Sequence, residues 1–316
     1  EEVQVPARFN TNINLRPLVP PTQKKAAGPM PPAWDEDELQ RICDHVRGFE
    51  LEPTAIGLPI SGRILMGQEG RDEDLEDVIE RIQMAGRVGF AVMTWNFTAL
   101  RASEGYAAQE GAGRGGAHLR DFDDARIRDL PPLDDVGRHG MEAMWGRLEY
   151  CLQRIVPAAE AAGVRLAMHP NDPPVPEYRG VAQPLWNLEG MKRLIEVVDS
   201  PANSLFFDTG VTTEYGDDAV EAIRYFGERD RIGIVHFRNV RVEQPYYKYT
   251  ETFLDEGECD IVGCMRAFAE VGYEGGIDPD HTPGIVGDTE ETQMGWAYAV
   301  GQLRALRLAA YGGKSS

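Results

Sequence analysis

Residues 165–170 read Arg-Leu-Ala-Met-His-Pro, a short apolar run that ends in a histidine. Residues 232–237 repeat the pattern as Ile-Gly-Ile-Val-His-Phe, and residues 276–281 repeat it as Gly-Ile-Asp-Pro-Asp-His. A fourth run, Ser-Leu-Phe-Phe at 204–207, ends in Asp208. Short apolar runs separated by helical patterns predict buried parallel strands. Polar side chains at the ends of such strands meet at one rim of a barrel, where they can surround a metal ion.

Segments of helical periodicity alternate with these runs along the chain. Helices are expected at 35–49, 72–86, 141–162, 188–198, 217–228, 260–271 and 290–310. Six strands are expected to end near residues 57, 94, 168, 207, 235 and 278. This alternation predicts an α/β fold with a parallel sheet. We expect residues 35–316 to form one (β/α)8 TIM-barrel domain, preceded by an irregular N-terminal arm (1–34) with a short strand at Val3–Val5.

The six strands are two fewer than a (β/α)8 barrel needs. The first two must come from the N-terminal arm, be degenerate or be missing from this chain. An open, doubly wound sheet is the alternative, but it usually carries a Gly-rich phosphate loop after its first strand, and none is evident. Long connecting segments, which we call excursions, follow the strands that end at Thr94, Met168 and Val235. They favour the barrel, because loops that follow strands lie on its C-terminal face, where active sites lie.

The composition excludes several classes of partner. The 316 residues carry a net charge of −20, so nucleic acid and anionic membrane surfaces are not expected to bind. No apolar run approaches the roughly 18 residues that span a bilayer, and no signal peptide is evident. The four scattered cysteines are expected to be reduced, mainly buried thiols. These features favour a cytoplasmic protein that acts on a small molecule.

His169, Asp208, His236 and Asp280 are the predicted metal ligands. Each lies at or just past a strand end, so successive βα units place them at neighbouring points of the rim. Two imidazoles and two carboxylates suit a divalent cation such as Mn²⁺, and Mg²⁺ or Co²⁺ less well. One histidine at a strand end is more often a structural residue, and Asp208 could simply cap a turn. Four such positions on consecutive strands favour the metal site.

Several short motifs resemble segments of the mannonate dehydratase family. The residues H-P-N-D-P-P at 169–174 resemble its H-P-D-D-P-P segment, and H-F-R-N-V at 236–240 resembles its H-[FL]-R-N-V segment. Four more motifs of this chain resemble segments of the family: P-D-H at 279–281, W-N-F at 95–97, R-G-G-A at 114–117 and D-E-G at 255–257. These motifs occur in the family's order over roughly residues 50–310.

The resemblance implies a xylose-isomerase-like TIM barrel that binds Mn²⁺ or a similar ion. It also implies removal of water from D-mannonate to give 2-keto-3-deoxy-D-gluconate. The family commonly has a Cys ligand where this chain has Asp208, and a carboxylate binds hard ions better than a thiolate does. Asp278 adds a further anion, which disfavours a carboxylate substrate unless the metal offsets it. Arg114 is implied to lie on a lid that closes over the substrate and excludes water.

Dehydration of a sugar acid needs a base for the proton next to the carboxylate and an acid for the departing hydroxyl. His281 is the predicted acid/base residue, and the alternative is that it orients Asp280. Arg238 is also predicted to be catalytic, because its fork suits a carboxylate, and a structural salt bridge is its alternative. The residues predicted to bind substrate are Asn96, Arg114, Asp172 and Asn239.

Three functions fit these features. The favoured one is a metal-dependent hydro-lyase acting on a sugar acid. An isomerase or epimerase of a sugar or polyol could use the same metal and barrel without expelling hydroxide, and a catalytically silent carbohydrate-binding relative is the third. Formation of a 2-keto-3-deoxy acid or of a ketose would separate the first two. A homo-oligomer is expected by resemblance alone.

Overall fold

The computed structural model describes residues 12–13, 28, 30–289 and 292–312. Within them, seven strands form one parallel sheet in the order β1-β2-β3-β6-β9-β10-β13. The strands are β1 (Asn12–Ile13), β2 (Ala55–Gly57), β3 (Val92–Trp95), β6 (Arg165–Met168), β9 (Asn203–Asp208), β10 (Ile232–His236) and β13 (Ile277–Asp278). All six strands predicted from the sequence are confirmed. β1 comes from the N-terminal arm and pairs with β2, whereas the expected strand at Val3–Val5 lies outside the described residues.

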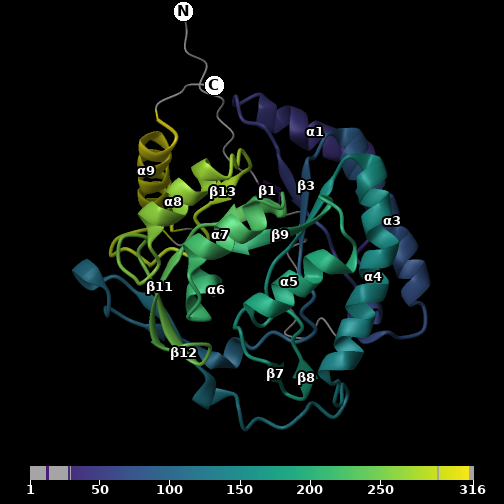
Figure 1. Cartoon of the computed structure of the whole chain (residues 1–316), viewed down its shortest axis with the longest axis horizontal. Helices are drawn as coiled ribbons and strands as arrows, with labels where there is room; N and C mark the ends of the chain where they lie inside the picture. Colours follow the sequence, from purple (N-terminus) through teal and green to yellow (C-terminus); the bar gives the residue numbers. More distant parts are fainter. Residues whose placement is uncertain (1–11, 14–27, 29, 290–291, 313–316) are drawn as a thin grey trace, which may run out of the picture.

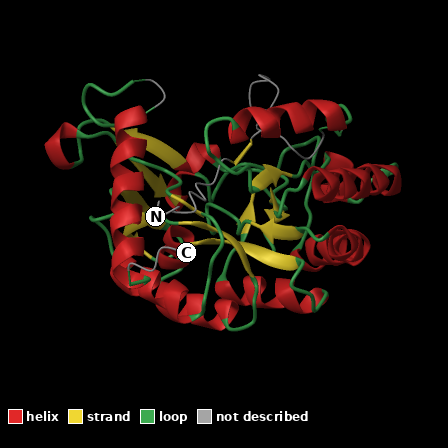
Figure 2. Cartoon of the chain, turned by 90° about the horizontal axis from the view of Figure 1, so that it is seen from above, coloured by secondary structure: helices red, strands yellow, loops and turns green. Residues whose placement is uncertain are grey.

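Helices follow the strands and surround them, as Figure 2 shows from above. Each of the seven predicted helices is confirmed, with small shifts at the ends, while the short helices α2 (Gly62–Met66) and α6 (Thr209–Glu214) were not predicted. The seven are α1 (Glu36–Arg47), α3 (Arg71–Val88), α4 (Met141–Ala162), α5 (Leu188–Val197), α7 (Ala219–Gly227), α8 (Ile261–Glu270) and α9 (Gln293–Ala310). This helix-wrapped parallel sheet is the architecture expected of a TIM barrel.

Two buried clusters explain why the strands read as continuous apolar runs. The main core includes Leu166, Leu205 and Val235, together with apolar side chains of the surrounding helices. A smaller cluster takes one residue from each of five neighbouring strands: Ala55, Val92, Ala167, Phe206 and Ile234. Successive side chains of a strand point to opposite faces, so both faces of the sheet are buried and both demand apolar residues.

A second, antiparallel sheet was not predicted. It contains β4 (Tyr106–Gln109), β5 (Leu119–Asp123), β11 (Asn239–Gln244) and β12 (Lys248–Thr252) in the order β11-β12-β5-β4. The sequence analysis placed these strands in loops, because each is short. The sheet is completed only when β5 pairs with β12, which comes from a distant part of the sequence. We call these four strands the cap sheet; β11 and β12 project from the lower left of the barrel in Figure 1.

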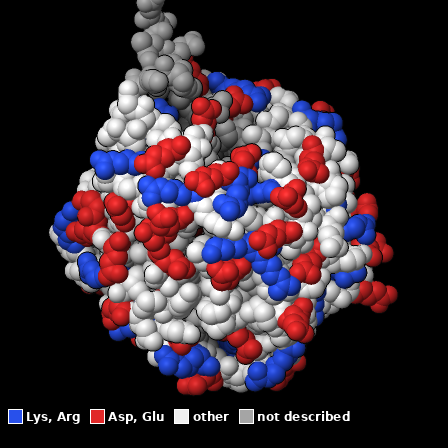
Figure 3. Space-filling model, viewed as in Figure 1, with Lys and Arg blue, Asp and Glu red and all other residues white. Residues whose placement is uncertain are grey.

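The helices, the cysteines and the surface charges agree with what the composition predicts. No helix in the described part of the chain is long and apolar enough to cross a membrane. All four cysteines are free and buried, as predicted. Figure 3 shows acidic and basic side chains interspersed on the viewed face, without a large basic patch there.

Candidate metal centre

Three predicted ligands lie at the ends of three neighbouring strands. His169 directly follows β6, Asp208 is the last residue of β9, and His236 is the last residue of β10. The ladder places His236 opposite Asp208 on one side and opposite Asp278 on the other. Parallel strands therefore bring residues from distant parts of the sequence to one rim, as the strand-end pattern predicts.

The ligand atoms of these three residues face one another. His169 Nε2 lies 3.4 Å from Asp208 Oδ2 and 3.1 Å from His236 Nδ1. His236 Nδ1 lies 3.5 Å from Asp208 Oδ2. The fourth predicted ligand, Asp280, places its Oδ2 3.5 Å from His236 Nδ1. One carboxylate oxygen and two imidazole nitrogens thus surround a common point, with a second carboxylate beside it.

Neighbouring hydrogen bonds orient the ligand atoms. His169 Nδ1 lies 2.8 Å from the Pro170 carbonyl oxygen and must donate to it, so the lone pair is on Nε2, which faces the cluster. Asp208 divides its two oxygens: Oδ1 accepts a hydrogen bond of 2.7 Å from Val211 N at the start of α6, and Oδ2 faces the histidines. Asp208 therefore caps a helix, the alternative noted from the sequence, and also points into the cluster.

These residues fit a divalent cation. An ion bound at about 2.1 Å has neighbouring ligand atoms roughly 3.0–3.5 Å apart, depending on the angle between the bonds. The separations among His169, Asp208 and His236 are 3.1, 3.4 and 3.5 Å. Two imidazole nitrogens and carboxylate oxygens are also suitable donors for an ion of this class.

Arg238 lies buried beside the cluster and binds three carboxylates. Nε donates to Asp208 Oδ2 at 3.0 Å, Nη1 to Glu214 Oε1 at 2.7 Å, and Nη2 to Asp172 Oδ2 at 3.1 Å. Burial disfavours the charged guanidinium, but these carboxylates outweigh burial and raise the pKa of Arg238 well above its usual value. The structural salt bridge, left open by the sequence, is thus the observed arrangement. Arg238 positions Asp208, one of the predicted ligands.

The charge around Arg238 is distributed unevenly. Burial opposes ionisation of Asp208, but Arg238 and the two imidazoles hold the pKa of Asp208 well below its usual range. Glu214 behaves oppositely, because burial raises its pKa well above the usual value. Its Oε2 has no hydrogen-bond partner in the described structure. Asp172, a predicted substrate residue, accepts hydrogen bonds from Tyr106, Tyr249 and Arg238, and so braces the centre.

Gly210 is required by the close approach of α6 to Arg238. A Cβ atom added at Gly210 would lie 2.6 Å from Arg238 Cγ and 2.8 Å from its Nη1. We expect Gly210→Ala to destabilise the fold by about 1–3 kcal/mol, because the buried guanidinium cannot move without losing its carboxylates. Denaturant unfolding would measure this change.

Gly146→Ala is the matched control, because Gly146 also lies in a helix but has open space around it. There alanine is expected to stabilise the protein by about 0.5–1 kcal/mol, through its helix propensity. Equal effects of the two variants would contradict the packing argument.

His281 lies between two carboxylates. Its Nδ1 is 3.0 Å from Glu251 Oε1 and 3.0 Å from Arg120 Nη2, and its Nε2 is 3.5 Å from Asp280 Oδ2. Burial disfavours the protonated ring, but Glu251 and Asp280 outweigh burial and raise the pKa of His281. Glu251 is itself buried, yet His281 and Arg120 lower its pKa to about 2. This geometry suits both predicted roles of His281, proton transfer and orientation of Asp280.

A cavity of about 340 Å³ opens beside Asp280. Its walls come from the cap sheet, the loop after β13 and the start of α9, and they include Arg120, Glu251, Asp280, His281 and Trp296. The volume lies near the lower end of the range for small-molecule sites, roughly 300–1,000 Å³. The candidate centre therefore adjoins a space in which a small molecule can bind.

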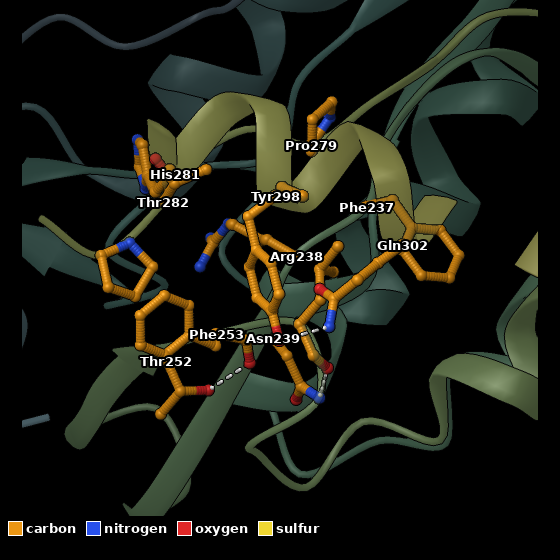
Figure 4. A pocket seen from close by; sticks show the side chains of 14 residues that line it. Phe237, Arg238, Asn239, Thr252, Phe253, Pro279, His281, Thr282, Tyr298 and Gln302 are labelled. Atoms are coloured by element: carbon orange, nitrogen blue, oxygen red, sulfur yellow. Dashed lines mark hydrogen bonds between the residues drawn. The ribbon is translucent and has the colours of Figure 1, made fainter. Parts of the chain in front are cut away.

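The remaining predicted substrate residues lie in different surroundings. Asn96 is half-buried and directly follows β3, at the same rim as the ligands. Arg114 lies farther out, where it forms ion pairs with Asp255 and Glu256. Asn239 is buried, and both ends of its amide bind backbone groups, including the Leu254 carbonyl at 2.8 Å and Cys259 N at 2.9 Å. In Figure 4 the Asn239 side chain lies well away from His281 and braces a loop.

The sequence analysis missed Arg120, Glu251 and Glu214. Arg120 and Glu251 lie in the cap sheet, where they pair although they are 131 residues apart in the sequence. No local motif marks them. Glu214 ends α6, a helix that was not predicted. Only its position six residues after Asp208 in the sequence could have indicated that Glu214 lies near the site.

Comparisons with known proteins agree with the motifs. The family model described as "D-mannonate dehydratase (UxuA)" matches residues 133–310. The mannonate dehydratase of Streptococcus uberis is 26% identical over 285 residues, which cover 83% of this chain and 82% of that protein. The solved mannonate dehydratase of Streptococcus suis serotype 2 superposes with a TM-score of 0.80 at 22% identity, covering 97% and 94% of the two chains. A xylose isomerase domain protein from Planctomyces limnophilus superposes with a TM-score of 0.58 at 15% identity, covering 88% and 86%. These structural matches confirm the xylose-isomerase-like TIM barrel.

Proposed function

This chain belongs to the D-mannonate dehydratase family, and from that premise we propose that it is a metal-dependent lyase that removes water from D-mannonate or a related sugar acid. The observation that carries the proposal is the convergence of His169, Asp208 and His236, with Asp280 between this cluster and the cavity. The alternative isomerase or epimerase uses the same barrel, but the curated relatives are named mannonate dehydratases.

We propose Mn²⁺ as the resident ion, held by His169, Asp208, His236 and Asp280. When bound, such an ion supplies Lewis-acid stabilisation of the negative charge that develops next to the substrate carboxylate, worth several kcal/mol. Arg238 contributes by holding Asp208 Oδ2 in place, and its Nε also lies 3.4 Å from Asp280 Oδ2. A cytoplasmic location and a homo-oligomeric state stay predictions.

The reaction removes the C2 proton and the C3 hydroxyl of the sugar acid. The hydroxyl leaves as water after it gains a proton, and the resulting enol becomes the 2-keto-3-deoxy acid when its hydroxyl proton is lost and C3 is protonated. We propose that His281 moves one of these protons, because its ring lines the cavity beside Asp280. Glu251, at 3.0 Å from Nδ1, fixes the ring and stabilises its protonated form.

Removal and replacement of the metal would test this proposal. We expect the protein treated with EDTA to produce no 2-keto-3-deoxy acid from D-mannonate, and added Mn²⁺ to restore the product. The product can be followed by its reaction with periodate and thiobarbiturate, and ketose can be assayed in parallel.

Other outcomes of this assay would redirect the assignment. Formation of ketose without the keto-deoxy acid would favour the isomerase or epimerase. No turnover of any sugar acid by protein with one Mn²⁺ per chain would favour the silent binding relative.

A further inference from the structure

We propose that Arg120, anchored by Glu251, binds the carboxylate of the substrate and thereby selects sugar acids over neutral sugars. This inference rests on the proposed function, because it names the residue that recognises the charge of the proposed substrate. Arg120 thus takes the carboxylate-binding role that the sequence analysis predicted for Arg238.

The first argument is that every nitrogen of Arg238 already binds a carboxylate, and that the side chain is almost inaccessible. Its Nε, Nη1 and Nη2 are bound by Asp208, Glu214 and Asp172, and 2% of its side chain is exposed. A substrate carboxylate would have to enter this buried cluster and compete with three carboxylates for one guanidinium, which is costly. Among the described residues that line the 340 Å³ cavity, Arg120 carries the one guanidinium or ammonium group.

The second argument is the way in which Arg120 is held. Nε and Nη2 donate to the two carboxylate oxygens of Glu251 at 2.9 and 2.5 Å, and the guanidinium lies over the ring of Tyr106, 4.3 Å from its centroid. Nη1 makes no hydrogen bond to any residue that the structure describes. The Arg120 side chain is 41% exposed, whereas Glu251 is 8% exposed. A buried anchor therefore presents a partly exposed guanidinium, with donors remaining, to the cavity.

The third argument is the position of Arg120 relative to the groups of the proposed reaction. Arg120 Nη2 lies 3.0 Å from His281 Nδ1, and His281 Nε2 lies 3.5 Å from Asp280 Oδ2. The proton to be removed is on the carbon bonded to the carboxylate. A carboxylate bound by Arg120 would therefore hold that carbon near His281 and the proposed metal. Because Glu251 already fixes the guanidinium, little side-chain freedom is lost when the substrate binds.

The alternative is that Arg120 only supports Glu251 and His281. The two roles differ in what they discriminate. A carboxylate-binding residue affects a sugar acid and leaves the binding of the corresponding neutral polyol unchanged, whereas a purely structural residue affects both compounds or neither. D-mannonate and D-mannitol form such a pair, because they share a carbon skeleton and differ at the carboxylate.

We would measure equilibrium binding of D-mannonate and of D-mannitol by calorimetry, with full-length protein supplied with Mn²⁺. The unchanged chain is expected to prefer D-mannonate. Arg120→Gln is expected to weaken D-mannonate binding about ten- to a hundredfold and to leave D-mannitol binding unchanged. Arg120→Lys keeps the charge but not the planar guanidinium, so it should weaken D-mannonate binding by less. This second variant keeps the test valid if Arg120→Gln fails to fold.

Arg126→Gln is the matched control. Arg126 pairs with Asp121 at 2.6 Å in the same excursion but does not line the cavity, so its replacement should leave the preference intact. The proposal is overturned if the unchanged chain shows no preference, or if Arg120→Gln weakens both compounds equally or neither. Dehydration of D-mannonate is assayed separately. If the unchanged chain prefers D-mannonate to D-mannitol but does not dehydrate it, the result contradicts the proposed function and not the role of Arg120.

Discussion

The His169→Ala variant is expected to lose its bound divalent ion and to convert D-mannonate at least about a thousandfold more slowly than the unchanged chain. His169 Nε2 faces both Asp208 Oδ2 and His236 Nδ1, so its removal leaves one imidazole and two carboxylates for the ion. Elemental analysis of the purified variant measures the ion, and formation of the 2-keto-3-deoxy acid measures the activity.

Two further variants separate the causes of that loss. His45→Ala replaces an exposed histidine on α1, far from the strand ends, and should change neither the metal content nor the rate. His281→Gln should keep the ion, because His281 is not a proposed ligand, and should lower kcat about 10²–10⁴-fold through loss of proton transfer. A His169→Ala variant that retained one ion per chain and full activity would refute the proposed ligand set.

The convergence of the strand-end residues was predictable because their signal is local. A buried parallel strand needs apolar residues on both faces, so the polar residue that ends it stands out in the sequence. His169 after β6, Asp208 at the end of β9 and His236 at the end of β10 all show this change. Once the strands are known to be parallel and neighbouring, the barrel places these residues together without any further information.

The wall of the cavity was not predictable in this way. Arg120 and Glu251 meet because β5 pairs with β12, and their residues 120 and 251 are opposite each other in that ladder. Neither excursion shows an apolar alternation strong enough to indicate a strand, since the cap sheet is short and partly exposed. Non-local pairing of this kind depends on the folded barrel, which brings the two excursions to the same rim.

Asp208 stands at a position where the resembled family commonly has a cysteine ligand, and its geometry suits the proposed replacement of a thiolate by a carboxylate. A thiolate offers one sulfur atom, whereas Asp208 offers two oxygens and uses them differently. Oδ1 begins α6 by accepting from Val211 N, and Oδ2 faces both the histidines and Arg238 Nε. Arg238 thus compensates the buried charge of Asp208, and it keeps Oδ2 directed at the point where we propose that the ion binds.

That role makes Arg238 a strong determinant of stability. Arg238→Met keeps much of the side-chain volume but leaves Asp208, Asp172 and Glu214 without their shared cation. Removing one partner of a buried ion pair costs about 3–5 kcal/mol, because the other charge stays buried and uncompensated. We therefore expect the melting temperature in EDTA to fall by about 6–15 °C, as measured by calorimetry or circular dichroism.

Arg231→Met is the matched control for this prediction. Arg231 is also buried, with 7% of its side chain exposed, but its partner Asp199 is 90% exposed. Loss of Arg231 leaves that carboxylate in water, where an unpaired charge costs little, so the expected change is about 1 kcal/mol. If both variants lost stability equally, packing of the arginine stem would explain the effect. A larger loss for Arg238→Met, partly recovered when Mn²⁺ is added, would indicate that the buried carboxylates need a cation and that Arg238 and the metal share this task.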